Sequence, residues 1–172
     1  MYIVDINRPD HCIDLKLLTD PEQILDYFSK NNISKYVYGI CYTTGTGSSV
    51  IKFGISLHGN NDVYPGGRII YDHVCDLKGW TEHFRPRIGI RGKDFYATLY
   101  NLGINNKDFF ELQIWDLNNY VISDNDYSFI AQVVKCQLIK QFEQYHGYRP
   151  VGDLYHWSWP ITKEKFEKDF NL

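Results

Sequence analysis

The stretch YVYGICYTTGTGSSVIKFGIS, residues 36–56, decides the fold. Its two ends are rich in aromatic and β-branched residues, which favour strands, and its centre is a run of glycine, serine and threonine. We therefore predict a β-hairpin with strands over residues 36–42 and 50–55 and a loop over residues 45–49. Lys52 is the unusual residue, because a charged side chain stands inside an otherwise apolar strand.

Side chains alternate between the two faces of a strand, so we expect Lys52 to share a face with Val50 and Gly54. Tyr38, on the first strand, is expected opposite Lys52, since cross-strand neighbours lie roughly 5 Å apart. The plainer interpretation is that Lys52 faces solvent and that Tyr38 is an ordinary packing residue.

The rest of the chain predicts helices around this hairpin. Asp20-Pro21 is a typical helix start, and apolar spacing continues that helix over residues 20–31. A short helix is predicted over residues 68–74, a strand over 109–115 and the longest helix over 128–145. The expected class is α+β: a small, three-stranded antiparallel sheet flanked by helices.

Composition narrows the possibilities further. A chain of 172 residues fits a single domain, here expected over residues 1–172. Its net charge of −3 means that nucleic-acid binding would need a local basic patch. The four cysteines form no CxxC pair, which excludes zinc-finger spacing and favours reduced thiols in a cytoplasmic protein. No apolar run approaches the roughly 20 residues of a membrane span, so no membrane association is expected.

Two short motifs on the predicted hairpin resemble those of a known family. The first strand carries YVYGI at residues 36–40, and the second carries KFGIS at residues 52–56. They resemble the paired motifs of the GIY-YIG nucleases, with Lys52 at the position of the second tyrosine. The family's next helix has an arginine and often a histidine, which Arg68 and His73 match.

The resemblance covers about residues 34–153, so the helix over 20–31 and the aromatic tail over 154–172 are additions to it. The chain departs from the family in its last helix. There the family places a glutamate three residues before a Leu-Ile pair, and this chain has Lys135. Glu143, further along the same helix, is the candidate replacement.

The resemblance implies a metal-dependent endonuclease that hydrolyses DNA with Mg²⁺ or Mn²⁺. Tyr38 and Lys52 would activate water, because a nearby ammonium favours the phenolate and a partly desolvated lysine can accept a proton. Arg68 would grip phosphate oxygens, and His73 would relay a proton or orient the tyrosine. Glu143 would hold the metal ion.

Each of these residues also has a plainer interpretation. Arg68 can pair with Asp72 one helical turn later, His73 can be structural, and Glu143 can be a solvated helix residue. The missing glutamate favours an alternative function, a catalytically inactive protein of the same fold that binds nucleic acid or protein. A third possibility is an unrelated α+β protein.

The most basic stretch of the chain adds a candidate nucleic-acid interface. Arg85, Arg87, Arg91 and Lys93 lie close together among two glycines and a proline. Arginines reach phosphates and guanine edges, which favours duplex DNA as the partner. The alternative is an ordinary charged surface loop. Site-specific cutting of both strands would favour a homodimer.

Overall fold

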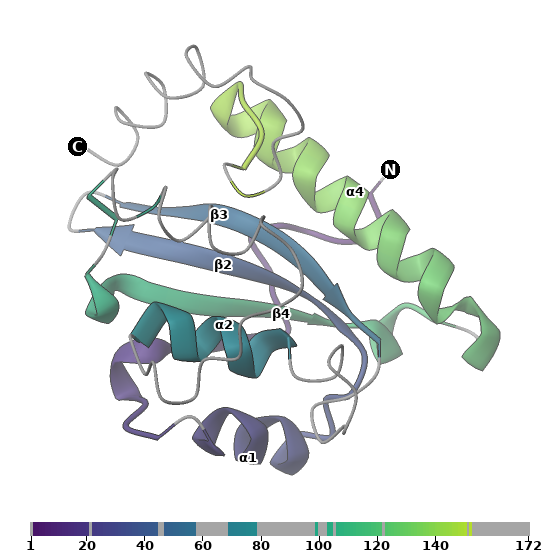
Figure 1. The fold of residues 1–172 in the computed structure, drawn as a ribbon. Helices are drawn as coiled ribbons and strands as arrows, with labels where there is room; N and C mark the ends of the chain where they lie inside the picture. The colour runs from purple at the N-terminus through teal and green to yellow at the C-terminus, as the bar shows by residue number, and fades with distance from the viewer. Residues whose placement is uncertain are drawn as a thin grey trace.

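A computed structural model describes residues 2–20, 22–44, 47–57, 69–78, 99, 103–104, 106–121, 123–150 and 152. The predicted α+β class is confirmed by a four-stranded antiparallel sheet with helices on both faces (Figure 1). The strands and helices are β1 (His11–Asp14), α1 (Glu22–Lys30), β2 (Tyr36–Thr44), β3 (Gly47–Ser56), α2 (Ile69–Lys78), β4 (Phe110–Asp116) and α4 (Tyr127–His146). Single 3-10 turns are η1 (Leu15–Leu17), η3 (Lys107–Phe109), η4 (Leu117–Asn119) and η5 (Asp124–Asp126). No helix in this described part of the chain is long and apolar enough to cross a membrane.

The sheet has one strand more than the three predicted. Its order is β1-β4-β2-β3, and the additional strand is β1 at the edge beside β4. With four residues, β1 is too short to show a clear alternating pattern in the sequence. The strand conformation of β1 is set by its pairing with β4. This pairing begins just before β1, where Asp10 N donates to Ile114 O at 2.8 Å.

The hairpin is longer than predicted. Strand pairing extends to Thr44 and Gly47, so the loop predicted over residues 45–49 is wrong for its last three residues, which belong to β3. Hydroxyl side chains stabilise this end of the hairpin by bonding across the two strands, since Thr43 Oγ1 donates to Ser48 Oγ at 3.2 Å. The polar residues here therefore extend both strands and do not form a loop.

A β-bulge interrupts the pairing of β2 with β3. Ile40 pairs with Lys52, whereas Cys41 pairs with Val50, so Ile51 is the extra residue. Paired residues of an antiparallel sheet point to the same face, and a bulge shifts the alternation by one residue. Val50 and Lys52 consequently lie on opposite faces, and the prediction that they share a face is wrong.

The ends of two helices follow from local chemistry, as predicted. Before α1, Asp20 Oδ1 accepts from Glu22 N at 2.7 Å, and Gln23 Oε1 accepts from Asp20 N at 3.1 Å. These reciprocal bonds form a capping box. Gly147, with φ of 75°, ends α4 in the left-handed conformation that glycine tolerates best. The long helix predicted over residues 128–145 is confirmed to within one residue at each end, since α4 covers Tyr127–His146.

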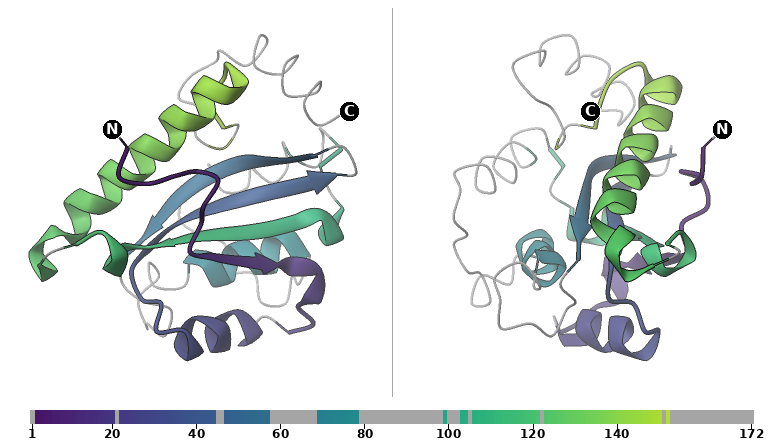
Figure 2. Two further views of the ribbon diagram at one scale, coloured as in Figure 1. Left: turned by 180° about the vertical axis from the view of Figure 1, so that it is seen from behind. Right: turned by 90° about the vertical axis from the view of Figure 1, so that its right-hand side faces the viewer.

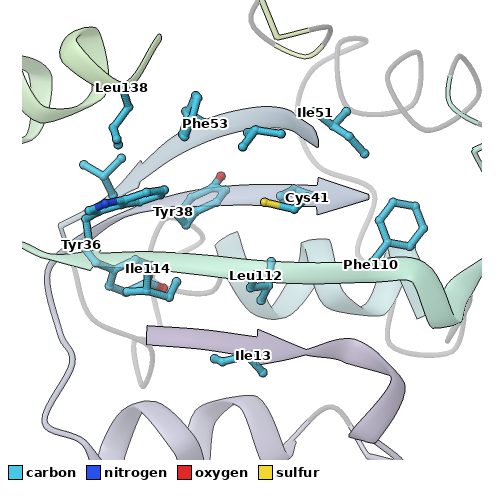
Figure 3. Close-up of a cluster of buried hydrophobic side chains, with 14 of the residues drawn as sticks. Ile13, Tyr36, Tyr38, Cys41, Ile51, Phe53, Phe110, Leu112, Ile114 and Leu138 are labelled. Carbon is cyan, nitrogen blue, oxygen red and sulfur yellow. The ribbon is translucent and has the colours of Figure 1, made fainter. Parts of the chain in front are cut away.

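The helices divide between the two faces of the sheet. Figure 2 shows α2 on one face and α4 on the other, with the N-terminal segment alongside α4, and α1 contacts α2. Phe28 of α1 stacks on Tyr36 of β2 with ring centroids 4.8 Å apart. On the opposite face, Figure 3 shows Leu138 of α4 beside Phe53. Both faces of the sheet are therefore covered, with β2 as an inner strand of the sheet and β3 as an edge strand.

Candidate functional site

Tyr38 lies in the middle of β2, on the face that α2 covers. Its ring centroid is 5.7 Å from the imidazole of His73 on α2, and its side chain is almost fully buried, with 2% exposed. The strand register pairs Tyr38 with Gly54. A Cβ atom at Gly54 would lie 2.1 Å from Tyr38 Cζ and 2.2 Å from the phenolic oxygen. Because glycine has no side chain, Gly54 leaves room for the Tyr38 ring above it.

Lys52 shares this face, but it pairs with Ile40 and is not directly opposite Tyr38 as predicted. The register explains the difference, because Gly54 takes the opposite position and Lys52 becomes a diagonal neighbour. Diagonal neighbours in a sheet lie roughly 7–8 Å apart, within reach of long side chains. Lys52 Nζ is partly buried and donates to the carbonyl oxygen of Gly152 at 3.3 Å. Tyr38, Lys52 and His73 therefore gather on one face, and Lys52 does not simply extend into solvent.

Glu143 comes from α4, which covers the other face of the sheet. Its Oε1 lies 3.1 Å from Arg149 Nε, and both side chains are about two-fifths exposed, at 41% and 39%. Gly147 reverses the chain between these two residues. Tyr148 then returns to the core and packs against Phe142 with ring centroids 5.5 Å apart. The predicted metal ligand is thus one half of an ion pair at the end of α4.

The described side chain that lies next to Glu143 is an arginine and not a second metal ligand. Mg²⁺ is usually held by one or two carboxylates together with waters and substrate phosphates. The carboxylate of Glu143 is already balanced by Arg149. Among the described residues, no three His, Cys, Asp or Glu side chains gather as metal ligands. Lys135, at the position of the family's glutamate, is partly exposed on α4.

Several predicted site residues lie outside the described residues. They are Arg68, which directly precedes α2 in the sequence, and the basic group of Arg85, Arg87, Arg91 and Lys93. The aromatic tail lies outside them as well. Their proposed roles in phosphate and DNA binding stay predictions.

Neither buried Cys41 nor exposed Cys12 has the character of a nucleophile. Burial, with a smaller contribution from Glu111 and then Cys12, raises the pKa of Cys41 well above its ordinary value. Burial and then Glu111 raise the pKa of Cys12 as well. A nucleophilic cysteine requires a lowered pKa, because the thiolate is the reactive form. Chemistry at this site is therefore not expected from either thiol.

No protein-family model, curated protein or solved structure matches this chain. The resemblance to the GIY-YIG nucleases therefore rests on the sequence motifs and stays a prediction.

Sequence reasoning missed two groups next to the predicted site, Arg149 and the carbonyl of Gly152. The pattern that points to them is the helix stop at Gly147. A chain that reverses there brings the following residues back over the last turn of the helix, where Glu143 lies. Arginine near a helix C-terminus is also favoured by the helix dipole.

Proposed function

We propose that this protein is an endonuclease that hydrolyses phosphodiester bonds in DNA, with Lys52 as the catalytic residue. The observation that carries the proposal is the common face of Lys52, Tyr38 and His73, built on a hairpin whose motifs resemble those of the GIY-YIG nucleases. Lys52 is the member that is both partly accessible and cationic. As an ammonium Lys52 would balance charge on the phosphate, and in its neutral amine form it would accept a proton from the attacking water.

Tyr38 is better suited to a positioning role than to direct contact with substrate, because only 2% of it is exposed. Its ring lies against His73, so it would orient the imidazole by packing. His73 would then donate a proton to the leaving oxygen. The requirement for Mg²⁺ or Mn²⁺ is a prediction of the family resemblance, and no step in this scheme passes through the metal.

The experiment is a nuclease assay on supercoiled plasmid, single-stranded DNA and RNA, each with Mg²⁺, Mn²⁺ or EDTA. We expect the wild-type protein to nick or linearise plasmid and Lys52→Ala to lose at least about 100-fold in rate, a typical loss for a proton-transfer group. Lys78→Ala is the matched control, because Lys78 Nζ is also partly buried and donates to a main-chain carbonyl, that of Leu15, at 2.7 Å. Tyr38→Phe keeps the ring that packs against His73 and should retain most of the rate.

Two results would refute this function. One is a wild-type protein that cleaves none of the three substrates with either metal. The other is an equal loss of rate in Lys52→Ala and Lys78→Ala, because that would reduce Lys52 to a structural residue.

A second candidate is a non-catalytic protein that binds nucleic acid. The ion pair between Glu143 and Arg149, together with Lys135 at the position of the family's glutamate, favours this alternative. It predicts binding to DNA without cleavage in the same set of assays.

A further inference from the structure

One side of α4 carries an exposed apolar patch. Phe129 is 70% exposed, Cys136 is exposed, and Val133 between them is partly exposed. Steps of four and three residues place these side chains on one side of the helix. In Figure 2 the first turns of α4 extend past the ends of the strands. Adjacent exposed apolar side chains, unlike scattered ones, mark a contact surface for another protein.

Opposite charges lie at the two ends of this patch. Asp126 directly precedes α4 and lies seven residues before Val133, and exposed Lys140 lies seven residues after it. Seven residues are almost two helical turns, so both charged residues lie on the same side of the helix as the patch. Asp126 Oδ2 accepts from Ser123 Oγ at 3.0 Å. Within the described part of the chain, neither Asp126 nor Lys140 forms an ion pair.

The N-terminal segment widens the patch along the second half of α4. Ile3 N donates to Gln137 Oε1 at 2.8 Å, which holds this segment beside the helix. The Ile3 residue is itself 49% exposed. Gln137 lies four residues after Val133, and Phe129 lies four residues before it. Exposed apolar residues are therefore present at matching distances on both sides of Val133.

We propose that this side of α4 is the interface of a homodimer, in which two copies of the helix pack antiparallel about a two-fold axis at Val133. Such an axis exchanges positions that lie equally far before and after Val133. It brings Phe129 of each copy onto Ile3 of the other copy, and Asp126 of each copy onto Lys140 of the other. The patch thus complements itself in both shape and charge.

The charges distinguish this arrangement from a parallel one. Two parallel helices in register would place Asp126 against Asp126 and Lys140 against Lys140, and like charges across an interface are unfavourable. A contact made by one helix and a short segment is smaller than the roughly 1,600 Å² of a standard interface. The dimer is therefore expected to be weak. It goes beyond the proposed function, because it does not require that the protein binds or cleaves DNA.

The first test is sedimentation equilibrium of the whole chain under reducing conditions, over concentrations of about 5–500 µM that suit a weak interface. The wild-type protein should change from monomer to dimer across this range. Phe129→Asp should weaken the dimer by at least about tenfold, because it places a charge in the apolar centre. Leu17→Asp is the matched control, since Leu17 is 74% exposed and lies outside α4, and it should leave the dimer unchanged.

A charge exchange tests the predicted pairing. Asp126→Lys should weaken the dimer, because the new lysine would face Lys140 of the other copy. Combining Asp126→Lys with Lys140→Asp restores opposite charges at both ends of the interface, so the double variant should recover most of the wild-type affinity.

Disulfide cross-linking tests the position of the axis. In a Val133→Cys, Cys136→Ser variant, the two new thiols would meet at the axis. Oxidised glutathione accepts the two electrons and two protons that they release, and is reduced to two glutathione molecules. The wild-type Cys136 thiols lie three residues from the axis in each copy, about 9 Å apart along the helices, so they should cross-link much more slowly.

The inference is overturned if the wild-type protein remains a monomer throughout the range, or if Leu17→Asp weakens the dimer as much as Phe129→Asp. Faster cross-linking through Cys136 than through Val133→Cys would overturn the antiparallel pairing, and so would a double charge variant that recovers no affinity. Dimerisation of a protein that cleaves no DNA refutes only the nuclease function.

Discussion

Gly54→Ala tests the geometry on which the candidate site depends. The new Cβ would lie 2.1 Å from Tyr38 Cζ, whereas carbon atoms in contact are about 3.5–4.0 Å apart. The Tyr38 ring must therefore move by roughly 1.5 Å, although it is 2% exposed and has little room. Overpacking of this kind costs about 1–3 kcal/mol, and the reduced backbone entropy of the unfolded chain returns less than about 1 kcal/mol. We expect a net loss of roughly 1–2 kcal/mol in the free energy of unfolding.

Urea unfolding followed by tryptophan fluorescence measures this loss, and a double-mutant cycle assigns it. In a Tyr38→Ala background the ring is absent, so Gly54→Ala should cost about 0.5 kcal/mol or less, which gives a coupling energy of roughly 1–2 kcal/mol. Gly39→Ala is the milder comparison, because its Cβ would meet Phe53 Cε1 at 3.3 Å and require a shift of only a few tenths of an ångström. The reasoning fails if Gly54→Ala is as stable as the wild type, or if it costs the same in both backgrounds.

Three further predictions concern the rest of the molecule. Gln141→Leu should lower the free energy of unfolding by about 2–4 kcal/mol, because the buried Gln141 amide accepts from Ile6 N and donates to Val4 O. Gln144→Leu is the control: its hydrogen bond with Tyr2 is exposed, so the free energy of unfolding should change by about 0.5 kcal/mol or less. Burial, then Asp10 and Asp116, raise the pKa of Tyr120 to about 12, whereas a tyrosine in the unfolded chain ionises near pH 10. The free energy of unfolding should therefore fall as the pH rises from about 10 to about 12, and it should fall less steeply in Tyr120→Phe. Thermal melts at stepped pH measure this difference. A thiol reagent at pH 8 should label exposed Cys136 in the native protein but Cys41 only after unfolding, since burial raises its pKa; native labelling of Cys41 would contradict the packing.

The parts of the fold that could be predicted from the sequence depend on neighbouring residues. Asp20 and Gln23 bond each other across a single turn, and Gly147 adopts its own left-handed conformation, so these helix ends are visible in short segments. The aromatic and β-branched run of β2 likewise predicts a strand from its own composition. The α+β class follows from the order of such segments.

The parts that were missed depend on distant residues. β1 is a strand because β4 offers it a partner roughly one hundred residues later, and its four residues have no clear pattern of their own. The bulge at Ile51 is equally hidden, because alternation along β3 predicts the wrong face for Val50. Registers and bulges are set by packing on both faces of the sheet, which no short stretch of sequence contains.

The candidate site divides in the same way. The sequence by itself determined that a hairpin carries Tyr38 and Lys52 and that His73 follows on a helix, since residue types and local patterns suffice for that. Only the tertiary structure decided that Gly54 lies opposite Tyr38, because strand register is a long-range property. Only the tertiary structure paired Glu143 with Arg149, since burial of Tyr148 brings the chain back over the end of α4.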